Sequence, residues 1–422
     1  MKQHFLNLGL FSVVVVAMVV GGSAERDSLA KIMEDFAAGY SQHAEQVGLR
    51  YEDVLPQAGQ SAVDFEASQV FFEEIKARLS ALPMNERDGE DALEYEILWF
   101  ETGVQLERLA LCLDYLEHPP VGEGLPANWY GYLVKAWTST NISPEAVEAL
   151  GYRLADEFLG KLKALEVEPR LPLEEGSAWL TADEAQIEAT YAATHANMLA
   201  RVSSLFPDFE ELPTLGFAPV ASPQMGQVPG YYSSNTLYYN TFRAEYDLRQ
   251  VDWLYIHEAV PGHHFQVQYE DARSVPVYRE DMAWGGFREG WAAYVEEDSL
   301  GQALGLYQTP DALASMYQWN LIRSVRLVLD VGLNTGELSD AEALEIWGRY
   351  LPDMEAVGQR EIDRMRRWPA QVLTYMVGRE VMLEARQAEM ERLGDVFDLK
   401  DFHTTLLSQR SIPVACIPRL FD

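Results

Sequence analysis

The sequence predicts a mainly α-helical protein, a large multi-helix domain of two lobes around a deep cleft with a small β element. Apolar residues recur at intervals of three and four through most of the chain, as they do on the buried face of a helix. Prolines and glycines interrupt this pattern around residues 212–229, just before a stretch rich in strand-forming residues. With 422 residues, the chain is long enough for one large core or two closely packed lobes.

Residues 1–24 are typical of an export signal. Lys2 supplies a positive start, an apolar run covers residues 8–20, and Gly22-Ser23-Ala24 offers small residues for cleavage. The run is short for a membrane span, which takes about 20 residues; an uncleaved membrane anchor is the alternative. We therefore expect an exported protein, periplasmic or secreted, with no stable membrane association once the signal is cleaved.

Residues 25–211 are predicted to form an N-terminal helical lobe. Ser143 precedes a proline that suits the first position of a helix, and Thr181-Ala-Asp-Glu184 is predicted to form a capping box. The predicted helices of this lobe span residues 28–46, 62–82, 91–116, 143–165 and 181–206.

Residues 212–422 are predicted to form a second, catalytic lobe, which begins with the β element. Residues 230–243 are rich in strand formers and could run along the cleft, where an extended peptide could pair with the strand edge. Tyr238, Tyr239 and Asn240 are then candidate substrate contacts. An ordinary hairpin with tyrosines at an interface is the alternative interpretation.

Helices follow at residues 321–333, 340–351 and 354–391, and Ser339-Asp-Ala-Glu342 is predicted to be a capping box. Arg323 and Arg326 are predicted to form a buried ion-pair network with Asp330, in preference to a functional site.

The charge of the chain limits its partners. It carries 66 acidic and 32 basic residues, a formal net charge of -34, which argues against nucleic acid and anionic lipid surfaces. Solubility is the simplest role for this charge, and a preference for cationic substrates is the alternative. The two cysteines, Cys112 and Cys416, could form one disulfide in an exported protein. Cys112 lies in an apolar run, so a buried free thiol is equally consistent.

Three of the eight histidines, His257, His263 and His264, fall within eight consecutive positions, and Glu258 follows the first. Imidazoles bind zinc, and a glutamate beside a ligand can take a proton from water. In the usual zinc-hydrolase motif the histidines are four residues apart on one helical face. Here a regular helix would separate them by about 9–10 Å along its axis, too far to share one ion. We expect Pro261-Gly262 to break the helix and bring His263 to the metal, with His264 as the second choice.

Residues 287–297 offer a third metal ligand. Glu289 and Glu296 are seven residues apart, so they share a helical face but lie about 10 Å from each other along the axis. One can therefore bind the metal, and the other can orient a ligand histidine. We predict that Glu289 binds the metal because Gly290 beside it leaves room, and that Glu296 and His264 support the ligands from behind.

The segments His-Glu-Ala-Val-Pro-Gly-His-His at 257–264 and Glu-Gly-Trp-Ala-Ala-Tyr-Val-Glu at 289–296 together resemble the bacterial "domain of unknown function 885" family. Its members are regarded as zinc metallopeptidases of the glutamate-zincin type. The resemblance extends from about Pro229 to the end of the chain and includes segments at 326–332, 375–378 and 412–414. It implies one Zn²⁺ per chain, bound by His257, His263 and Glu289, with Glu258 as the base.

One position departs from this resemblance. Asn334 stands where the family usually has a histidine. If that histidine stabilises a transition state, activity in this chain is expected to be weaker or differently tuned.

Three further residues are candidates for contact with the substrate. Zinc peptidases often use a tyrosine to donate a hydrogen bond to the oxyanion, and Tyr375 lies in a segment shared with the family. Arg379 and Arg386 follow at helical spacings that place them on the same face, where one could bind a substrate carboxylate through two hydrogen bonds.

The predicted function is zinc-dependent hydrolysis of peptide bonds, acting on short peptides through a metal-activated water with Glu258 as general base and Tyr375 at the oxyanion. A catalytically weak or inactive binding protein on the same framework is one alternative, which Asn334 favours. A metal-dependent amidase acting on a small amide is the other. Cleavage at chain ends or internally, and the oligomeric state, do not follow from the sequence.

Overall fold

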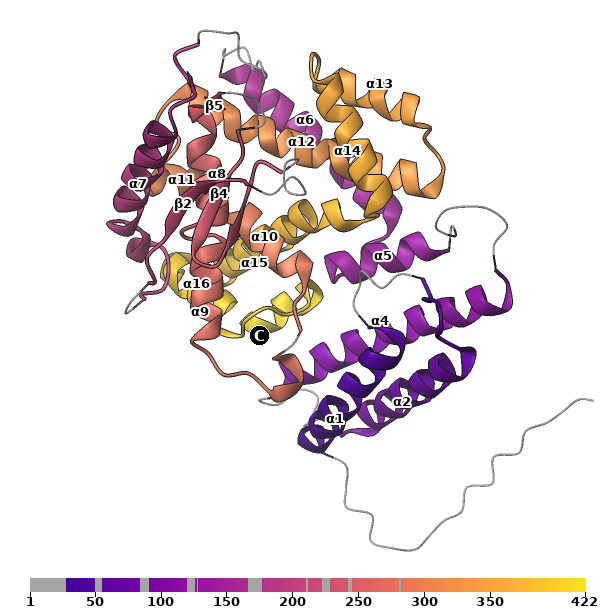
Figure 1. Cartoon of the computed structure of the whole chain (residues 1–422). Coiled ribbons are helices and arrows are strands. Elements are labelled where there is room, and N and C mark those ends of the chain that lie inside the picture. The colour runs from indigo at the N-terminus through magenta and orange to yellow at the C-terminus, as the bar shows by residue number, and fades with distance from the viewer. Residues whose placement is uncertain are drawn as a thin grey trace, which may run out of the picture.

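The structure is a computed structural model that describes residues 28–49, 55–83, 91–119, 126, 128–165, 177–209, 212–221, 228–241, 245–280 and 282–422. The predicted export signal at residues 1–24 lies outside these ranges. Within them the protein is mainly helical, as predicted, with fifteen α-helices and five short strands (Figure 1).

The N-terminal helices begin where the sequence predicts. The Ser28 hydroxyl accepts from the backbone N–H of Lys31, and the Ser143 hydroxyl accepts from that of Ala146, so each serine caps a helix. The predicted capping box at residues 181–184 is wrong, because Thr181 lies in a strand and Asp183 caps the helix instead. The helices of this half are α1 (Leu29–Val47), α2 (Ala62–Ala81), α4 (Ala92–Glu117), α5 (Trp129–Thr138), α6 (Pro144–Ala164) and α7 (Glu184–Leu199).

The β element consists of two small sheets. β1 (Leu180–Thr181) pairs antiparallel with β5 (Tyr246–Asp247). The second sheet has the order β2-β4-β3, in which β2 (Gly216–Pro219) is parallel and β3 (Gly230–Ser233) antiparallel to β4 (Thr236–Tyr239). Ser234 and Asn235 form the hairpin turn with positive φ angles. The stretch therefore contains a hairpin, and β3 forms an edge of the described sheet.

The second half is a series of helices from α8 to α16. Ser339 and Glu342 form the predicted capping box. The single helix predicted over residues 354–391 is two helices, because the chain turns at Ala370, where φ is 67°. The helices are α8 (Val251–Glu258), α9 (His263–Asp271), α10 (Gly285–Val295), α11 (Asp298–Ala303), α12 (Pro310–Thr335), α13 (Asp340–Tyr350), α14 (Glu355–Arg367), α15 (Thr374–Leu393) and α16 (Leu399–Ser408).

Short 3-10 helices connect or follow these elements. They are η1 (Val202–Ser204), η3 (Leu248–Gln250), η4 (Val277–Arg279), η5 (Gln371–Leu373), η6 (Gly394–Val396) and η7 (Val414–Phe421).

Helices from the two halves of the sequence pack together. α6 lies along α12, and α7 packs against α8 (Figure 1). These contacts cross the boundary predicted at residues 211 and 212, and residues 210–211 lie outside the described part. The division into two lobes therefore stays a prediction.

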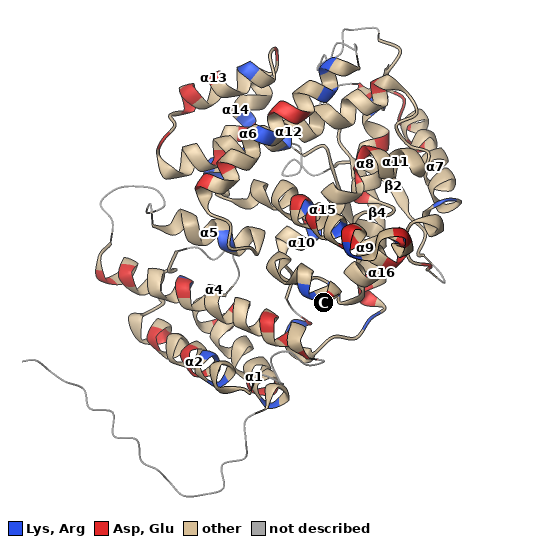
Figure 2. Ribbon diagram, turned by 180° about the vertical axis from the view of Figure 1, so that it is seen from behind, with Lys and Arg blue, Asp and Glu red and all other residues tan. Residues whose placement is uncertain are grey.

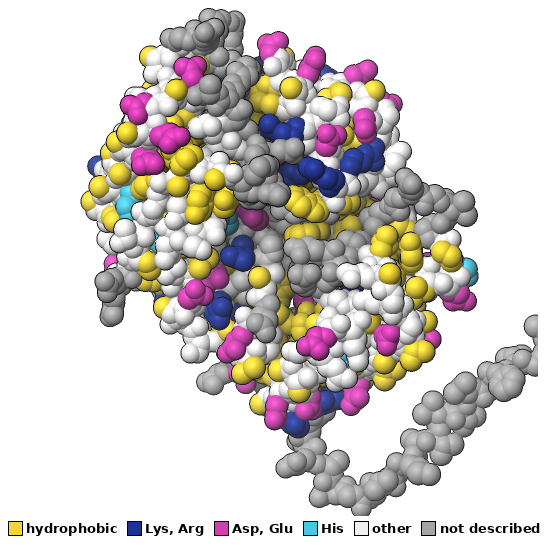
Figure 3. All heavy atoms as spheres, viewed as in Figure 1, with side chains coloured by type: hydrophobic (Ala, Val, Ile, Leu, Met, Phe, Trp, Pro, Cys, Tyr) yellow, Lys and Arg dark blue, Asp and Glu magenta, His cyan; other side chains and the backbone are white. Residues whose placement is uncertain are grey.

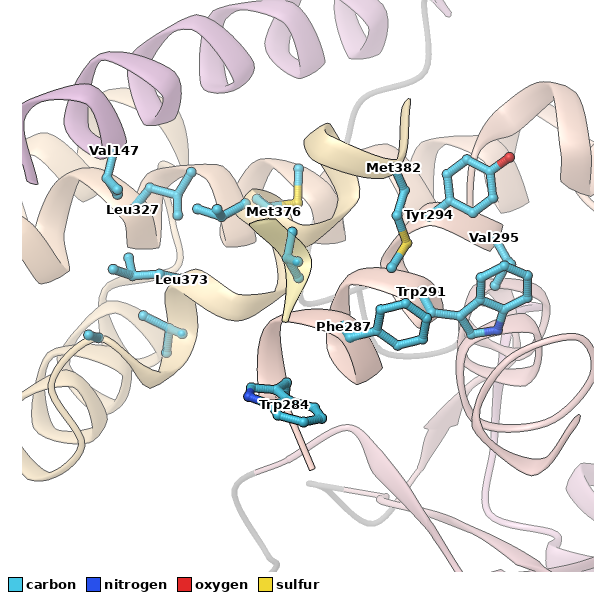
Figure 4. Close-up of a cluster of buried hydrophobic side chains, with 14 of the residues drawn as sticks. Val147, Trp284, Phe287, Trp291, Tyr294, Val295, Leu327, Leu373, Met376 and Met382 are labelled. Atoms are coloured by element: carbon cyan, nitrogen blue, oxygen red, sulfur yellow. The ribbon is translucent and has the colours of Figure 1, made fainter. Parts of the chain in front are cut away.

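The core next to the cleft forms where α10 and α15 cross. The buried side chains of this core include Phe287 and Trp291 on α10 and Trp284 just before it. Met376 and Met382 on α15 belong to the same cluster (Figure 4). The helices approach closely at two glycines: a Cβ on Gly290 would lie 2.6 Å from the Cα of Gly378, and a Cβ on Gly378 would lie 2.0 Å from the carbonyl oxygen of Gly286. Glycine is required at this crossing because a side chain would separate the helices.

Both cysteines are buried free thiols, so the disulfide alternative is not realised. Burial raises the pKa of Cys112 to about 11 and that of Cys416 to about 12. Among the described helices, none combines the length and the apolar character needed to cross a membrane. Acidic residues occur on helices throughout the protein (Figure 2).

Candidate metal centre

The predicted helix break separates the first two candidate ligands. α8 ends at Glu258, α9 begins at His263, and the Val260–Pro261 peptide between them is cis. The connection folds back so closely that a Cβ on Gly262 would lie 1.9 Å from the carbonyl oxygen of His257. Only glycine fits there. The fold-back brings the His257 and His263 rings to a centroid distance of 4.9 Å.

Glu289 on α10 lies beside His257 and His263, so that three residues with side chains that can bind a metal come together. Its Oε2 lies 3.6 Å from Nε2 of His257 and 3.5 Å from Nε2 of His263. In a tetrahedral zinc site with bonds of about 2.0–2.1 Å, ligand atoms are roughly 3.3–3.4 Å apart. The carboxylate oxygen therefore lies about as far from each imidazole nitrogen as two ligands of one such ion would lie from each other, and these donor types suit zinc.

A second carboxylate, Glu258, lies beside this set. Its Oε1 is 4.0 Å from Nε2 of His257, and ligand atoms of His257, Glu258 and His263 all lie within 4.8 Å of one another. Two glutamates therefore lie near the histidines, and the carboxylate of Glu289 is closer to Nε2 of His257 than that of Glu258. We call His257, Glu258, His263 and Glu289 the candidate metal centre.

Glu296 lies behind His257, on the side away from Glu289. Its Oε1 is 2.6 Å from Nδ1 of His257, and its Oε2 accepts from Nη1 of Arg323 at 2.5 Å. The Glu296 side chain is fully buried. A carboxylate at Nδ1 holds a proton there, so that the Nε2 lone pair would face His263 and Glu289 once the second proton of the ring is lost.

The contacts shift the acidities of the ligands in opposite directions. Burial lowers the pKa of His257, but hydrogen bonds to Glu289 and Glu296 outweigh it and raise the pKa to about 9. Burial raises the pKa of Glu289, yet hydrogen bonds from His257 and His263 hold it well below its usual range. A metal cation would take the place of the shared proton, because ligand imidazoles bind in their neutral form.

His264 points away from this cluster. Its Nδ1 lies 3.1 Å from the hydroxyl of Tyr232, and its Nε2 lies 3.1 Å from the carbonyl oxygen of Pro213. Burial lowers the pKa of His264 to about 4. The structure therefore brings His263 to the candidate metal centre and uses His264 to connect α9 to the strand region.

The candidate metal centre lies in a cleft of about 1280 Å³ lined by both halves of the chain. Tyr40, Leu49 and Glu101 come from the N-terminal half. Tyr375 also lines the cleft, with its ring 6.1 Å from that of His257. Burial and the charge of Glu289 raise the pKa of Tyr375.

The predicted substrate contacts on the strands have other neighbours. Tyr238 stacks on Tyr231 at 4.8 Å, Tyr239 is fully buried, and Asn240 donates to the carbonyl oxygen of Val228. All three belong to or follow the central strand β4 and lie outside the set of described residues that line the cleft. The edge strand β3, with Tyr231 and Tyr232, lines it instead.

The two arginines predicted to bind a substrate carboxylate are in ion pairs elsewhere. Arg379 pairs with Glu380, and Arg386 pairs with Glu297 at 2.7 Å. Neither belongs to the described lining of the cleft.

The ion-pair network predicted on α12 forms with other partners. Arg323 pairs with Glu296, and Arg326 pairs with Glu361 at 2.8 Å. Asp330, the predicted partner, instead accepts hydrogen bonds from the Tyr130 hydroxyl at 2.7 Å and the Ala370 amide at 2.8 Å. The prediction of Asp330 as partner was wrong because its side chain leaves α12 toward α5 and η5.

Asn334, one turn beyond Asp330, lies outside the described lining of the cleft. Its side-chain amide donates to the backbone carbonyl oxygen of Asp330 at 2.9 Å and toward that of Met365 at 3.4 Å.

The cleft contains a set of residues that the sequence analysis did not assign to the site. They are arginines of α12 and α14 together with two tryptophans. On the surface, Lys and Arg side chains gather over α14 (Figure 3). A signal for them exists in the sequence, because three arginines follow one another at helical spacing in a chain poor in basic residues. These lining residues are Arg323, Arg326, Arg360, Arg364, Arg367, Trp319 and Trp368.

Comparison with known proteins places the fold. A crystal structure of a predicted lipoprotein from Colwellia psychrerythraea is similar with a TM-score of 0.63 and 19% identity, over 93% of this chain and 74% of that one. The structure of a predicted lipoprotein of unknown function from Shewanella oneidensis is similar with a TM-score of 0.59 and 17% identity, over 93% of this chain and 77% of that one. No curated protein matches the chain significantly.

The sequence motifs that form the candidate metal centre were the basis of the resemblance noted above. The model of the family described as "Bacterial protein of unknown function (DUF885)" matches residues 23–420, nearly the whole chain. The protein therefore belongs to the DUF885 family.

Proposed function

We propose that the protein is a zinc-dependent hydrolase that cleaves peptide bonds in short peptides. The observation that carries the proposal is the position of one Glu289 carboxylate oxygen between two histidines. This oxygen lies 3.6 Å from Nε2 of His257 and 3.5 Å from Nε2 of His263. A second carboxylate, Glu258, lies 4.0 Å from Nε2 of His257, and we assign it the role of base rather than ligand.

The residues of the centre have distinct roles in this proposal. His257, His263 and Glu289 would hold Zn²⁺, and Glu296 would keep His257 oriented through Nδ1. A bound Zn²⁺ would polarise a substrate carbonyl and lower the pKa of a water molecule beside it. Glu258 would accept the proton from the attacking water and pass it to the leaving amine.

Tyr375 is proposed to donate a hydrogen bond to the oxygen of the attacked carbonyl. Its ring lies 6.1 Å from that of His257, and its raised pKa keeps the hydroxyl protonated at neutral pH. A donor in this position stabilises the negative charge that develops on the oxygen.

The edge strand β3 supports a peptide as the substrate. Val228, Pro229 and Gly230 line the cleft together with Tyr231 and Tyr232. Among the described strands, β3 pairs only with β4, so its other edge can accept an extended peptide through backbone hydrogen bonds.

We further propose that the protein is exported. Residues 1–24 have the pattern of an export signal, and the two similar structures are described as those of predicted lipoproteins.

Metal analysis and peptide hydrolysis test the proposal together. The full chain should bind one Zn²⁺, hydrolyse members of a library of short peptides, lose activity with a chelator and regain it with Zn²⁺. Glu258→Gln should keep the metal and lower turnover by about 10²–10⁴-fold, the usual contribution of a general base. Zinc at one per chain without turnover of any peptide or amide would overturn the proposal and favour a binding protein.

A further inference from the structure

The lining of the cleft is rich in arginine although the chain as a whole is strongly acidic. The lining includes six arginines and four glutamates, whereas the full sequence has 32 basic and 66 acidic residues. Five of these arginines come from two helices that pack together, α12 and α14. We call these five residues the arginine wall: Arg323, Arg326, Arg360, Arg364 and Arg367.

The helical spacing directs the arginine wall into the cleft. Arg360, Arg364 and Arg367 occupy positions i, i+4 and i+7 of α14, which form one face of a helix. Arg323 and Arg326 lie one turn apart on α12. Arg366, by contrast, leaves α14 on another side, where it pairs with Asp340 at 2.8 Å.

Two carboxylates, Glu296 and Glu361, lie among these five guanidinium groups. Glu296 pairs with Arg323, and Glu361 pairs with Arg326 at 2.8 Å and lies 4.0 Å from Arg360. Arg364 donates at 2.8 Å to the side-chain oxygen of Gln371, which is a neutral amide. The α12–α14 side of the cleft thus favours a negatively charged ligand.

Several donors of the wall are buried without an acceptor. The Nε–H groups of Arg323, Arg326 and Arg364 and the indole N–H of Trp319 have no hydrogen-bond partner among the described residues. Arg323 and Arg326 are each 2% exposed. Buried donors without an acceptor destabilise a protein, and here they belong to side chains that line the cleft.

The arginine wall begins one side chain away from the candidate metal centre. Arg364 donates a hydrogen bond to the Tyr375 hydroxyl, and the Arg323 guanidinium lies 5.2 Å from the centre of the Tyr375 ring. The Tyr375 ring in turn is 6.1 Å from that of His257. A group bound at the wall would therefore be close to a bond held at the metal centre.

We propose that the arginine wall binds a carboxylate of the peptide substrate, so that the protein prefers anionic peptides. This inference rests on the proposed function and specifies its substrate class. Guanidinium groups bind carboxylates through two parallel hydrogen bonds, which makes the selection geometric as well as electrostatic. The carboxylate is supplied either by the C-terminus of the peptide, as in removal of C-terminal residues, or by an acidic side chain near the cleaved bond.

Peptide binding separates these two sources. Four probes suffice: acetyl-trialanine, its C-terminal amide, an amidated tripeptide with a central glutamate, and the same tripeptide with glutamine. Calorimetry would measure their binding to the full chain carrying Glu258→Gln and loaded with Zn²⁺, so that the peptide is not consumed. We expect one or both anionic probes to bind about 10–100-fold more tightly than their neutral counterparts, as charge-assisted hydrogen bonds predict.

Variants assign the preference to the wall. Arg364→Gln should remove most of the difference in affinity between anionic and neutral probes. Arg367→Gln, at the more exposed end of the wall, should reduce this difference and serves as the test if Arg364→Gln folds poorly. Arg366→Gln on the same helix is the matched control and should keep the difference. Equal binding of anionic and neutral probes to the parent protein would overturn the proposal, as would a preference that survives both wall variants.

The outcome is independent of whether the protein is a peptidase. The same titrations in the presence of a chelator should retain the preference for anionic probes, because the arginine wall contributes no metal ligand. A preference for anionic probes without zinc-dependent hydrolysis would overturn the proposed function alone. Zinc-dependent hydrolysis of neutral and anionic peptides at equal kcat/KM would overturn the arginine wall alone.

Discussion

The polar groups on the two sides of the cleft differ in their hydrogen-bond partners. On the α8–α10 side, His257 is held between Glu289 and Glu296, and Glu296 is itself held by Arg323. On the α12–α14 side, Arg323, Arg326 and Arg364 each keep a buried N–H without an acceptor among the described residues. Side chains positioned by their neighbours are suited to chemistry that requires fixed geometry. Side chains with unused donors are suited to holding a ligand. Under the proposed function, the α8–α10 side is the reacting side and the α12–α14 side is the binding side.

The largest expected effect concerns the ligands of the reacting side. His263→Gln should weaken Zn²⁺ binding by more than about 10²-fold, because it removes one of three ligands rather than a supporting residue. His264→Gln is the matched control and should leave Zn²⁺ affinity nearly unchanged, since His264 contacts Tyr232 and Pro213 instead. Competition with a chromophoric chelator would measure both. Equal losses in the two variants would remove His263 from the metal centre.

The support of His257 should matter less than the ligands themselves. Glu296→Gln keeps the size of the side chain but removes the charge that faces Nδ1 of His257 and Arg323. Outer partners of ligand histidines typically contribute about 10–100-fold to metal affinity. We expect a loss in that range, read by the same competition assay, with the fold retained by circular dichroism. An unchanged affinity would show that the reacting side does not depend on this contact.

The helix crossing that carries Glu289 can be tested by stability. Gly378→Ala should lower the free energy of unfolding by about 1–3 kcal/mol, because the added methyl group would overlap the backbone of α10. Gly348→Ala in α13 is the matched control: its methyl group would meet no atom within 4 Å, and we expect a gain of about 0.5–1 kcal/mol. Denaturant titration would measure both. Equal effects at the two positions would contradict the close approach of α10 and α15.

A buried carboxyl group on α12, outside the described lining of the cleft, should hold its proton more tightly in the folded protein than in the unfolded chain. Burial raises the pKa of Asp330 to about 7, although Tyr130 and Ala370 donate hydrogen bonds to it. Between the unfolded pKa of about 4 and the folded value, the folded state binds the proton more tightly, so stability falls as pH rises. Asp330→Asn should flatten this slope by up to about 1.4 kcal/mol per pH unit. If Asp330 were the ion-pair partner of Arg323 and Arg326, its folded pKa would lie below the unfolded one, and its contribution would be nearly flat in this window and rise with pH only below it.

The residues predicted for the reacting side lie close together in the structure because their signals in the sequence are local. Pro261 and Gly262 interrupt a helix at fixed positions, and the spacing of Glu289 and Glu296 follows from helical geometry alone. Gly290 was predicted to make room for a metal, yet it makes room for Gly378 of α15. The reason given for choosing Glu289 was therefore wrong, because it depended on the packing of two distant helices, and the role of Glu289 as a metal ligand stays a prediction.

The binding side was missed because its meaning depends on tertiary packing. Arg360, Arg364 and Arg367 were included in one long predicted helix, and the turn at Ala370 that separates α14 from α15 was not recognised. Periodicity identifies one face of α14 but cannot tell whether that face meets solvent, core or a cleft. Arg379 and Arg386 were preferred because their helical spacings from Tyr375 place them on its face, and the structure pairs them with Glu380 and Glu297 instead.

The excess of 34 negative charges on the chain has a kinetic consequence for a cleft lined by arginine. An anionic ligand that approaches from solution is repelled by the negative surface of the protein. This repulsion is overcome once the ligand is within roughly a Debye length of the guanidinium groups, about 8 Å at physiological ionic strength. Dissolved ions screen that outer field more than the partly buried inner one. Moderate salt should therefore accelerate the capture of anionic peptides, the reverse of what is observed for electrostatically steered encounters.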